Sequence, residues 1–362
     1  MVKPTATTKT LQQQPPQETP ISQAVEVSKS FFAKTGLRAG AGGGGAKFVQ
    51  ALDRVSLSVN PGETVGLVGE SGCGKSTLGR TLIKLETPTA GDVFFEGVNI
   101  TKLSGTKLRK IRQSMQMIFQ DPASSLNPGY SVYSTLKEAI QVHRGRLSSR
   151  KLNAHIAALL NMVGLPVSCL SRLPHEFSGG ERQRIAIART LAVEPRFIVA
   201  DEPISSLDLS SQEQIVTLLK KMRQELHVAF LLINHDMETV KRLCDRVAVM
   251  YLGQIVELAS TNALFKSPNH PYSKALISAV LSTNPEKKSR LNILQGDPPS
   301  PLDPPTGCYF HPRCPFMEVQ CKLLAPALRK TTNGHFTKCH FDFDGNDKLN
   351  NFATALPANL KN

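Results

Sequence analysis

The sequence contains no apolar run near the roughly 18 residues that a membrane-spanning helix needs. Its longest apolar stretches, at residues 228–233 and 247–252, are much shorter. Residues 1–20 also lack the apolar core of a signal peptide, so we expect a cytosolic protein. In that compartment the seven cysteines are expected to be thiols or metal ligands rather than disulfides.

Acidic residues are scarce relative to basic ones: 29 Asp and Glu stand against 43 Lys and Arg, for a net charge of +14. Residues 102–151 alone carry ten basic and two acidic side chains. This segment is either a solvated basic face or a surface that meets a partner or the anionic leaflet of a membrane. Few aromatic residues interleave it, which argues against a stacking platform for single-stranded nucleic acid.

The 362 residues allow two or three domains with a sizeable core. Residues 1–24 are rich in Thr, Gln and Pro and are predicted to be a disordered tail. We expect a main domain at 25–282, a Cys-rich extension at 283–345 after a proline-rich linker, and a short tail at 346–362.

The hydrophobic pattern of the main domain predicts an α/β fold with a mainly parallel sheet. Half-buried strands are expected at residues 25–32, 52–59 and 93–95, and buried strands at 64–68, 197–200 and 229–233. Helices are expected at 75–85, 183–192, 211–226 and 237–243. Residues 131–172 look helical throughout and predict an inserted helical subdomain, while the glycine-rich run 40–45 predicts a flexible loop.

Residues 69–76 read GESGCGKS, which matches G-x4-G-K-[ST] between a predicted strand and a predicted helix. Glycines let backbone N–H groups approach phosphates, and the helix N-terminus adds unpaired donors. Lys75 is expected to reach the β- and γ-phosphates and Ser76 to bind Mg²⁺, while Cys73 is expected to be passive. The predicted nucleotide-binding residues are Gly69, Ser71, Gly72, Gly74, Lys75, Ser76 and Thr77.

Two carboxylates end the predicted strand FIVADE, at the sheet edge where α/β proteins bind ligands. Asp201 suits a hold on Mg²⁺, and Glu202 is placed to orient and polarise an attacking water. A second anion site is predicted where SGGE, residues 178–181, opens a helix. A single nucleotide does not need two such sites in one subunit.

These features resemble the ABC family of transport ATPases, whose signature is usually LSGGQ and whose ATP sites form between two head-to-tail subunits. Phe177 replaces the usual Leu and Glu181 the usual Gln, while Ser178, Gly179 and Gly180 are intact. The resemblance implies a P-loop ATPase domain with a RecA-like parallel sheet, an antiparallel β subdomain and a helical subdomain at about residues 121–180. It also implies that the SGG segment contacts the partner's ATP.

Other family positions follow in order along the chain. Gln120 in IFQDP resembles the Q-loop, which senses Mg²⁺ and leads into the helical subdomain that touches the membrane partner. Residues 206–208 resemble the D-loop, which would bring Asp208 to the dimer interface. His235 in INHD resembles the switch histidine that contacts the γ-phosphate and aligns the water with Glu202.

Phe31 occupies the place of the aromatic residue that stacks on adenine, although Phe32 could do so and both could be core. Residues 253–280 and 307–321 resemble the closing segment and terminal extension of the ATP-binding subunits of oligopeptide and dipeptide importers. The likeness is nearly continuous from residue 25 to about residue 340.

The extension carries a C-x5-C-x6-C-x17-C spacing formed by Cys308, Cys314, Cys321 and Cys339. Four thiolates are a full ligand set for Zn²⁺ or an iron–sulfur cluster, and the wide loops favour the larger cluster. The resemblance implies a [4Fe–4S] cluster, with Zn²⁺ or unliganded thiols as open alternatives. His311, His335 and His340 lie close enough in sequence to substitute as ligands, whereas Cys169 and Cys244 are expected in the core.

The resemblance therefore implies an ATPase that uses ATP and Mg²⁺ to drive uptake of di- and oligopeptides from the cytoplasmic face of the membrane. Its implied partners are a second ATPase subunit, usually a distinct paralogue, two membrane-spanning permeases and a substrate-binding protein. The alternative is a soluble ABC-type ATPase acting on nucleic acid or ribosomes, which the positive charge favours. The chain has one cassette and no room for a long coiled coil, so we expect no nucleic-acid partner.

Overall fold

The computed structural model describes residues 19–33, 47–279, 296–331, 335–343 and 349–350. The predicted glycine-rich loop, most of the predicted N-terminal tail and nearly all of the predicted C-terminal tail lie outside these ranges. The first strand starts at Ser22, inside the predicted tail, because Ile21 and Ala24 are buried in the core of an antiparallel sheet. The prediction of disorder up to residue 24 was therefore too long.

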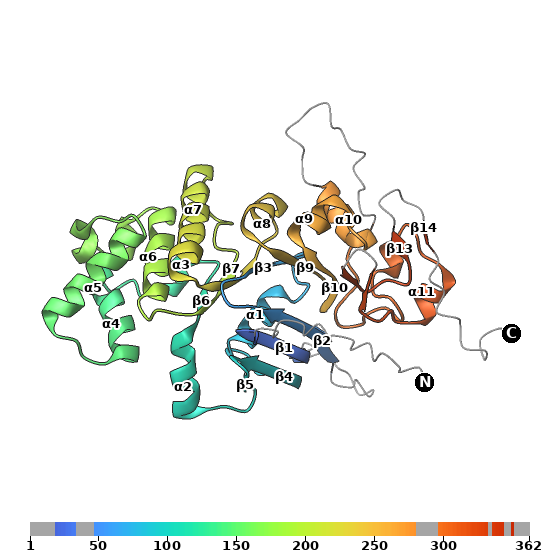
Figure 1. The fold of residues 1–362 in the computed structure, drawn as a ribbon, viewed down its shortest axis with the longest axis horizontal. Coiled ribbons are helices and arrows are strands. Elements are labelled where there is room, and N and C mark those ends of the chain that lie inside the picture. Colours follow the sequence, from blue (N-terminus) through green and yellow to red (C-terminus); the bar gives the residue numbers. More distant parts are fainter. Residues whose placement is uncertain (1–18, 34–46, 280–295, 332–334, 344–348, 351–362) are drawn as a thin grey trace, which may run out of the picture.

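The central sheet has eight strands in the order β11-β12-β10-β9-β3-β8-β7-β6 (Figure 1). The parallel strands are β9 (Arg246–Tyr251), β3 (Thr64–Val68), β8 (Ala229–Ile233), β7 (Phe197–Asp201) and β6 (Met115–Ile118). The antiparallel strands are β10 (Gln254–Ser260), β12 (Phe336–Thr337) and β11 (Arg329–Lys330). Every residue of β3, β7 and β8 is buried, as expected for strands of a sheet covered on both faces. The predicted mainly parallel sheet is confirmed.

The helices that accompany this sheet include the four predicted ones and two that were not predicted. The predicted helices are α1 (Lys75–Leu82), α6 (Gly179–Leu191), α7 (Leu209–Leu226) and α8 (Met237–Leu243), and the other two are α9 (Thr261–Lys266) and α10 (Pro271–Ser278). Helix α7 begins two residues before its predicted start because Asp208 caps it: the carboxylate accepts the Ser211 N–H at 3.0 Å.

An antiparallel sheet of four strands packs beside α1. Its order is β2 (Lys47–Val59), β1 (Ser22–Ala33), β4 (Ala90–Phe95) and β5 (Val98–Asn99). Val27, Leu52 and Val93 point into the core that this sheet shares with α1. This sheet supplies the antiparallel β subdomain that the family resemblance implied.

The helical subdomain lies at one end of the molecule (Figure 1). It contains α3 (Pro122–Ser125), α4 (Val132–Arg144), α5 (Ser149–Met162), η1 (Val167–Ser171) and η2 (Pro174–Glu176), and α2 (Gly105–Ser114) precedes β6. Leu136, Ile140, Ile156 and Leu160 are fully buried between α4 and α5. In the described part of the chain no helix is both long and apolar enough to cross a membrane.

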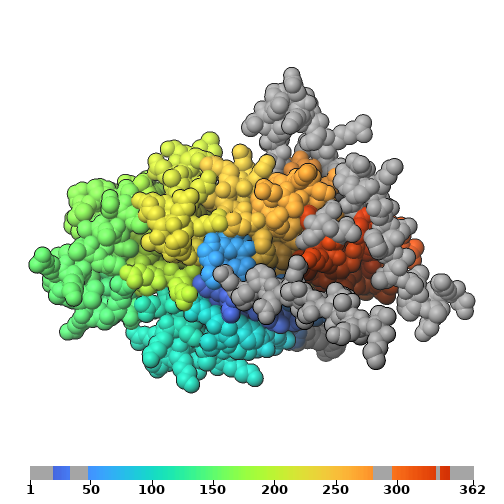
Figure 2. All heavy atoms as spheres, in the orientation of Figure 1, coloured from blue at the N-terminus to red at the C-terminus, as the bar shows by residue number. Residues whose placement is uncertain are grey.

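The Cys-rich extension lies at the opposite end (Figures 1 and 2). Besides β11 and β12 it contains η3 (His311–Arg313), α11 (Val319–Leu323), β13 (Asp342–Phe343) and β14 (Leu349–Asn350). Strand β12 pairs with β10, so the extension continues the central sheet. Phe310, at 1% exposure, packs against Tyr251 and Tyr272 of the main domain, with ring centroids 5.3 and 5.5 Å away.

Candidate functional site

A cavity of about 470 Å³ opens at the carboxyl ends of β3, β6 and β7. It brings the predicted phosphate-binding loop together with the residues predicted to act on water and Mg²⁺. The lining residues are Val49, Ala51, Ser71, Gly72, Gly74, Lys75, Ser76, Thr77, Gln120, Glu202, His235 and Pro301. Gly69 starts the loop, and Asp201 is next to Glu202 at the end of β7.

Two glycines give the loop its shape. Gly74 is the N-cap of α1 at φ 105°, and a Cβ there would lie 2.3 Å from the carbonyl oxygen of Ala51. A Cβ at Gly69, where φ is 152°, would lie 2.1 Å from the carbonyl oxygen of Met250. Only glycine fits these positions, because the loop passes against the backbone of two neighbouring strands.

The Lys75 ammonium lies inside the loop and is 6% exposed. It donates hydrogen bonds of 2.8 Å to the carbonyl oxygens of Gly69 and Glu70. The lysine therefore cross-links the two ends of the loop and presents one positive charge to the cavity. Cys73 is buried beside it, and burial raises the pKa of its thiol, so this cysteine is no activated nucleophile.

A hydroxyl and a carboxylate meet at the start of α1. Ser76 donates a hydrogen bond of 2.9 Å from Oγ to Oδ1 of Asp201. Burial raises the pKa of Asp201, and a divalent cation would oppose that effect. A hydroxyl beside a buried carboxylate is a donor set that fits Mg²⁺, which prefers oxygen ligands.

Glu202 is the centre of a polar group at the mouth of the cavity. Gln120 donates from Nε2 to Glu202 Oε2 at 2.9 Å, and His235 Nδ1 lies 3.5 Å from the same oxygen. The Glu202 backbone has φ 45°, and its N–H donates to the carbonyl oxygen of Ile233 at 2.9 Å. The geometry thus joins three residues that are separated by up to 115 positions in the sequence.

The SGGE segment lies on a different surface. Ser178 and Glu181 form a capping box: Glu181 accepts the Ser178 N–H at 2.8 Å, and Ser178 accepts the Glu181 N–H at 3.3 Å. The Ser178 N–H lowers the pKa of Glu181. Gly180 packs against Ser211, whose Oγ would lie 2.5 Å from a Cβ at Gly180. Ser211 lies on α7, the helix that is capped by Asp208 of the predicted D-loop. The signature segment is therefore beside the D-loop and is not part of the cavity lining.

Comparisons with known proteins identify the family of this chain. A family model described as "ABC transporter" matches residues 52–205, and one described as "Oligopeptide/dipeptide transporter, C-terminal region" matches residues 256–321. The oligopeptide transport ATP-binding protein AppF of Bacillus subtilis is 47% identical over 296 residues, which cover 81% of this chain and 89% of AppF. This chain belongs to the ABC transporter family. It is an ATPase of the branch of ATP-binding subunits that includes oligopeptide and dipeptide importers.

Solved structures of ABC cassettes share the fold of this ABC subunit. The cassette MJ0796, in a dimeric post-hydrolysis state bound to ADP and Pi, is 28% identical with a TM-score of 0.57. The match covers 66% of this chain and 98% of that one. CbiO1 of Clostridium perfringens is 26% identical with the same TM-score, over 68% of this chain and 91% of CbiO1. None of these relatives supports the nucleic-acid alternative.

Phe31, which was predicted to stack on adenine, pairs in the sheet with Val49 of the cavity lining, and its role stays a prediction. Phe31 is not among the lining residues: it is 38% exposed, and the Lys29 ammonium lies 4.8 Å from its ring centroid. The cavity is lined by Val49 on the neighbouring strand and by Pro301 from the extension. Pro301 accepts a backbone hydrogen bond of 3.2 Å from Gln50. No sequence signal marked Pro301, because it is about 250 residues from the strand that it touches.

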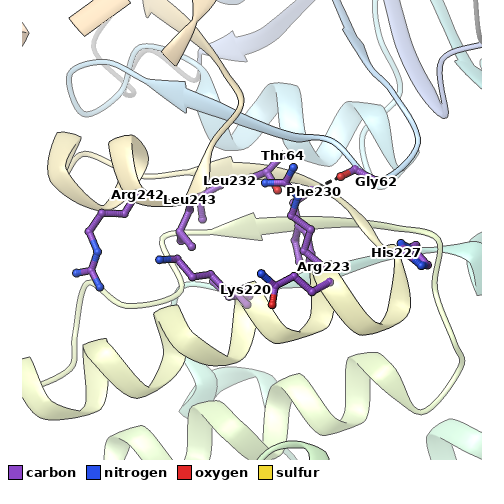
Figure 3. Close-up of a pocket in the computed structure, with 11 residues that line it drawn as sticks. Gly62, Thr64, Lys220, Arg223, His227, Phe230, Leu232, Arg242 and Leu243 are labelled. Carbon is purple, nitrogen blue, oxygen red and sulfur yellow. Dashed lines mark hydrogen bonds between the residues drawn. The ribbon is translucent and has the colours of Figure 1, made fainter. Parts of the chain in front are cut away.

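A second cavity, of about 590 Å³, lies between α7 and α8 (Figure 3). Its basic residues include Arg223 and Arg242. Arg223 pairs with Asp245 at 2.8 Å and donates to the Gly62 carbonyl, while Arg242 forms a two-pronged pair with Glu213. These partners neutralise the two arginines, while Lys220 and His227 also line the cavity.

The four cysteines of the extension gather in one region. Cys308 and Cys339 pack against a small core of Cys321 and Phe341, and the Cys308 N–H donates to the Cys321 carbonyl at 2.8 Å. Burial, together with the neighbouring thiols, raises the pKa of Cys314 and Cys339 to about 12.

The described residues contain no group of three or more His, Cys, Asp or Glu arranged to hold a metal ion. His335 and His340 bond elsewhere, to Glu257 at 2.8 Å and to the Leu324 carbonyl at 2.9 Å. Cys169 and Cys244 are buried in the core of the main domain, as predicted.

Proposed function

We propose that this ABC subunit powers the uptake of di- or oligopeptides from the cytoplasmic face of the membrane. The proposal is supported by the family model that matches its C-terminal side and by the oligopeptide transport name of AppF. In the proposed complex it works with a second ATPase subunit, two permeases and a substrate-binding protein.

One observation carries this proposal: the ATP cavity adjoins a groove that is suited to a partner. The groove measures about 650 Å³ and lies between α1, α2, α4 and α6. Leu108, Phe119 and Val142 line it with apolar side chains, and Arg109 and Arg112 are also in its lining. Phe119 lines the groove, and the next residue, Gln120, lines the ATP cavity and donates a hydrogen bond to Glu202. Only Gln120 therefore separates an occupant of the groove that contacts Phe119 from the water-activating carboxylate. We assign the groove to a cytoplasmic segment of the permease.

This assignment predicts that Val142→Asp prevents assembly with the permease and leaves the ATPase activity of the free subunit unchanged. Val142 is 46% exposed, so the fold tolerates the change, but the charge would be desolvated in the groove. Co-purification with the permease measures assembly. Val167→Asp is the matched control, since Val167 is 53% exposed on η1 and does not line the groove. Equal assembly of both variants would contradict the assignment.

We further propose the following roles in the ATP cavity. The loop N–H groups and Lys75 bind the phosphates, and Ser76 with Asp201 and Gln120 holds Mg²⁺. The bound Mg²⁺ supplies charge neutralisation at the phosphates. Glu202 accepts a proton from the attacking water, and His235 orients that water from the same side of the cavity.

The separation of the signature from the ATP cavity supports a head-to-tail dimer. Ser178, Gly179 and Gly180 present a helix N-terminus that does not face the chain's own phosphate-binding loop. Such an end attracts phosphate, so we propose that it contacts the ATP bound to a partner subunit, together with Asp208. The similar MJ0796 cassette is dimeric, which supports the formation of a dimer.

For the extension we propose a [4Fe–4S] cluster held by Cys308, Cys314, Cys321 and Cys339. The support is that the four thiols lie near one another, since Cys308, Cys314 and Cys321 all raise the pKa of Cys339. We expect protein purified without oxygen to contain about four iron and four sulfide per chain, and Cys321→Ser to lose both. If protein purified without oxygen contained no iron, and Cys321→Ser did not change its iron and sulfide content, the cluster would be contradicted and the thiols would be unliganded.

A further inference from the structure

The Cys-rich extension reaches the phosphate-binding loop through Arg313. This arginine lies on η3 between Cys308 and Cys314, and its side chain is 6% exposed. Its two terminal nitrogens donate to the two carboxylate oxygens of Glu70 at 2.8 and 2.9 Å. Glu70 is the second residue of the loop, so a two-pronged ion pair connects positions that are 243 residues apart.

Glu70 is fixed from three directions. Arg313 holds its carboxylate, the buried Tyr272 hydroxyl accepts its N–H at 2.8 Å, and its carbonyl accepts the Lys75 ammonium at 2.8 Å. The position of Glu70 therefore sets the position of the ammonium that faces the phosphates. A displaced Glu70 would remove one of the two carbonyl contacts that hold Lys75.

Arg313 is itself held by the aromatic cluster at the base of the extension. Its guanidinium lies 6.0 Å from the ring centroid of Tyr251, whose ring also meets Phe310 and Tyr272 at 5.3 and 4.8 Å. The guanidinium is thus fixed on one side by packing and on the other by the carboxylate. A planar guanidinium held in this way fixes both the distance and the orientation of the Glu70 carboxylate, which a lysine ammonium cannot do.

We propose that Arg313 is a positioning residue of the ATP site: its pair with Glu70 pre-orders the phosphate-binding loop and Lys75, so nucleotide affinity depends on the docked extension. The inference concerns the chain's own ATP site and does not depend on the permease, the cargo or the cluster. A loop that must be ordered on binding costs affinity, whereas a pre-ordered loop does not.

The test measures the binding of Mg²⁺-ATP to the purified full-length chain by titration calorimetry. Arg313→Gln is expected to weaken binding about tenfold, and Arg313→Lys less than that. The KM for ATP should rise by a similar factor while kcat stays within about twofold, because Glu202 and His235 are untouched. Arg329→Gln is the matched control: Arg329 forms an ion pair with Asp342 inside the extension and does not line the ATP cavity, so this change should leave ATP affinity unaltered.

A double-mutant cycle separates positioning from general stability. Glu70→Gln should weaken ATP binding as Arg313→Gln does, and the double variant should bind no more weakly than the weaker single variant. If Arg313→Gln does not fold, Glu70→Gln and Arg313→Lys test the pair instead. Unchanged affinity, additive losses, or an equal loss in Arg329→Gln would overturn the proposal.

Discussion

Glu202→Gln is expected to bind Mg²⁺-ATP as tightly as the wild-type chain and to hydrolyse it at least about a hundredfold more slowly. The amide has the size of the carboxylate and can keep the contact with Gln120, which is 2.9 Å from the Glu202 oxygen. It cannot accept the proton of an attacking water. Binding is measured by calorimetry and turnover by phosphate release.

The control is Glu213→Gln on the surface of α7, where the carboxylate pairs with Arg242 far from the cavity lining. It is expected to leave both binding and turnover unchanged. If Glu202→Gln hydrolysed ATP at the wild-type rate, Glu202 would have no role in activating water.

The position of Glu202 also explains how the ATP cavity could respond to a partner. Its oxygen contacts Gln120, which follows a residue of the groove, and lies 3.5 Å from His235, whose side chain is 62% exposed. Movement of the helical subdomain would displace Gln120 directly, because no other residue separates it from the groove. The contacts of this Glu202 oxygen therefore link the ATP cavity to the proposed permease contact.

The sequence predicted the elements that depend on local patterns. The continuous apolar runs of β3, β7 and β8 and the glycine pattern of residues 69–76 require no knowledge of distant residues, and the structure has them as predicted. Asp208 was identified from the sequence as a D-loop residue. Its capping of α7 was not predicted, so the helix begins earlier than expected. Local sequence patterns were therefore enough to predict most of the residues that line the ATP cavity.

Contacts across long sequence separations could not be predicted in this way. The pairing of β12 with β10, the approach of Pro301 to Val49 and the pair between Arg313 and Glu70 all depend on how the extension docks. No periodicity encodes such a contact, because each partner looks locally like an ordinary surface residue. The expected stacking residue, Phe31, was selected by its position in the family pattern; it pairs with Val49 beside the cavity, and its role stays a prediction.

Ser178→Arg is expected to leave ATP binding to the chain's own loop within about twofold and to lower turnover about a hundredfold. In the proposed dimer the arginine would fill the space of the partner's γ-phosphate contact, and loss of a single anion-stabilising group costs a factor of this order. Ser131→Arg is the matched control, since Ser131 is also an N-cap whose side chain accepts a backbone N–H, at the start of α4.

The concentration dependence of turnover completes this test. Wild-type activity per chain should rise with chain concentration as dimers form, whereas Ser178→Arg should stay low at every concentration. Loss of the cap costs only about 1 kcal/mol of stability, so a thermal melt distinguishes unfolding from a defective dimer site. A dilute wild-type preparation shown to be monomeric, yet hydrolysing ATP at its full rate, would mean that one chain supplies every group the reaction needs, and the signature at 178–180 would then have only the capping role that its hydrogen bonds give it.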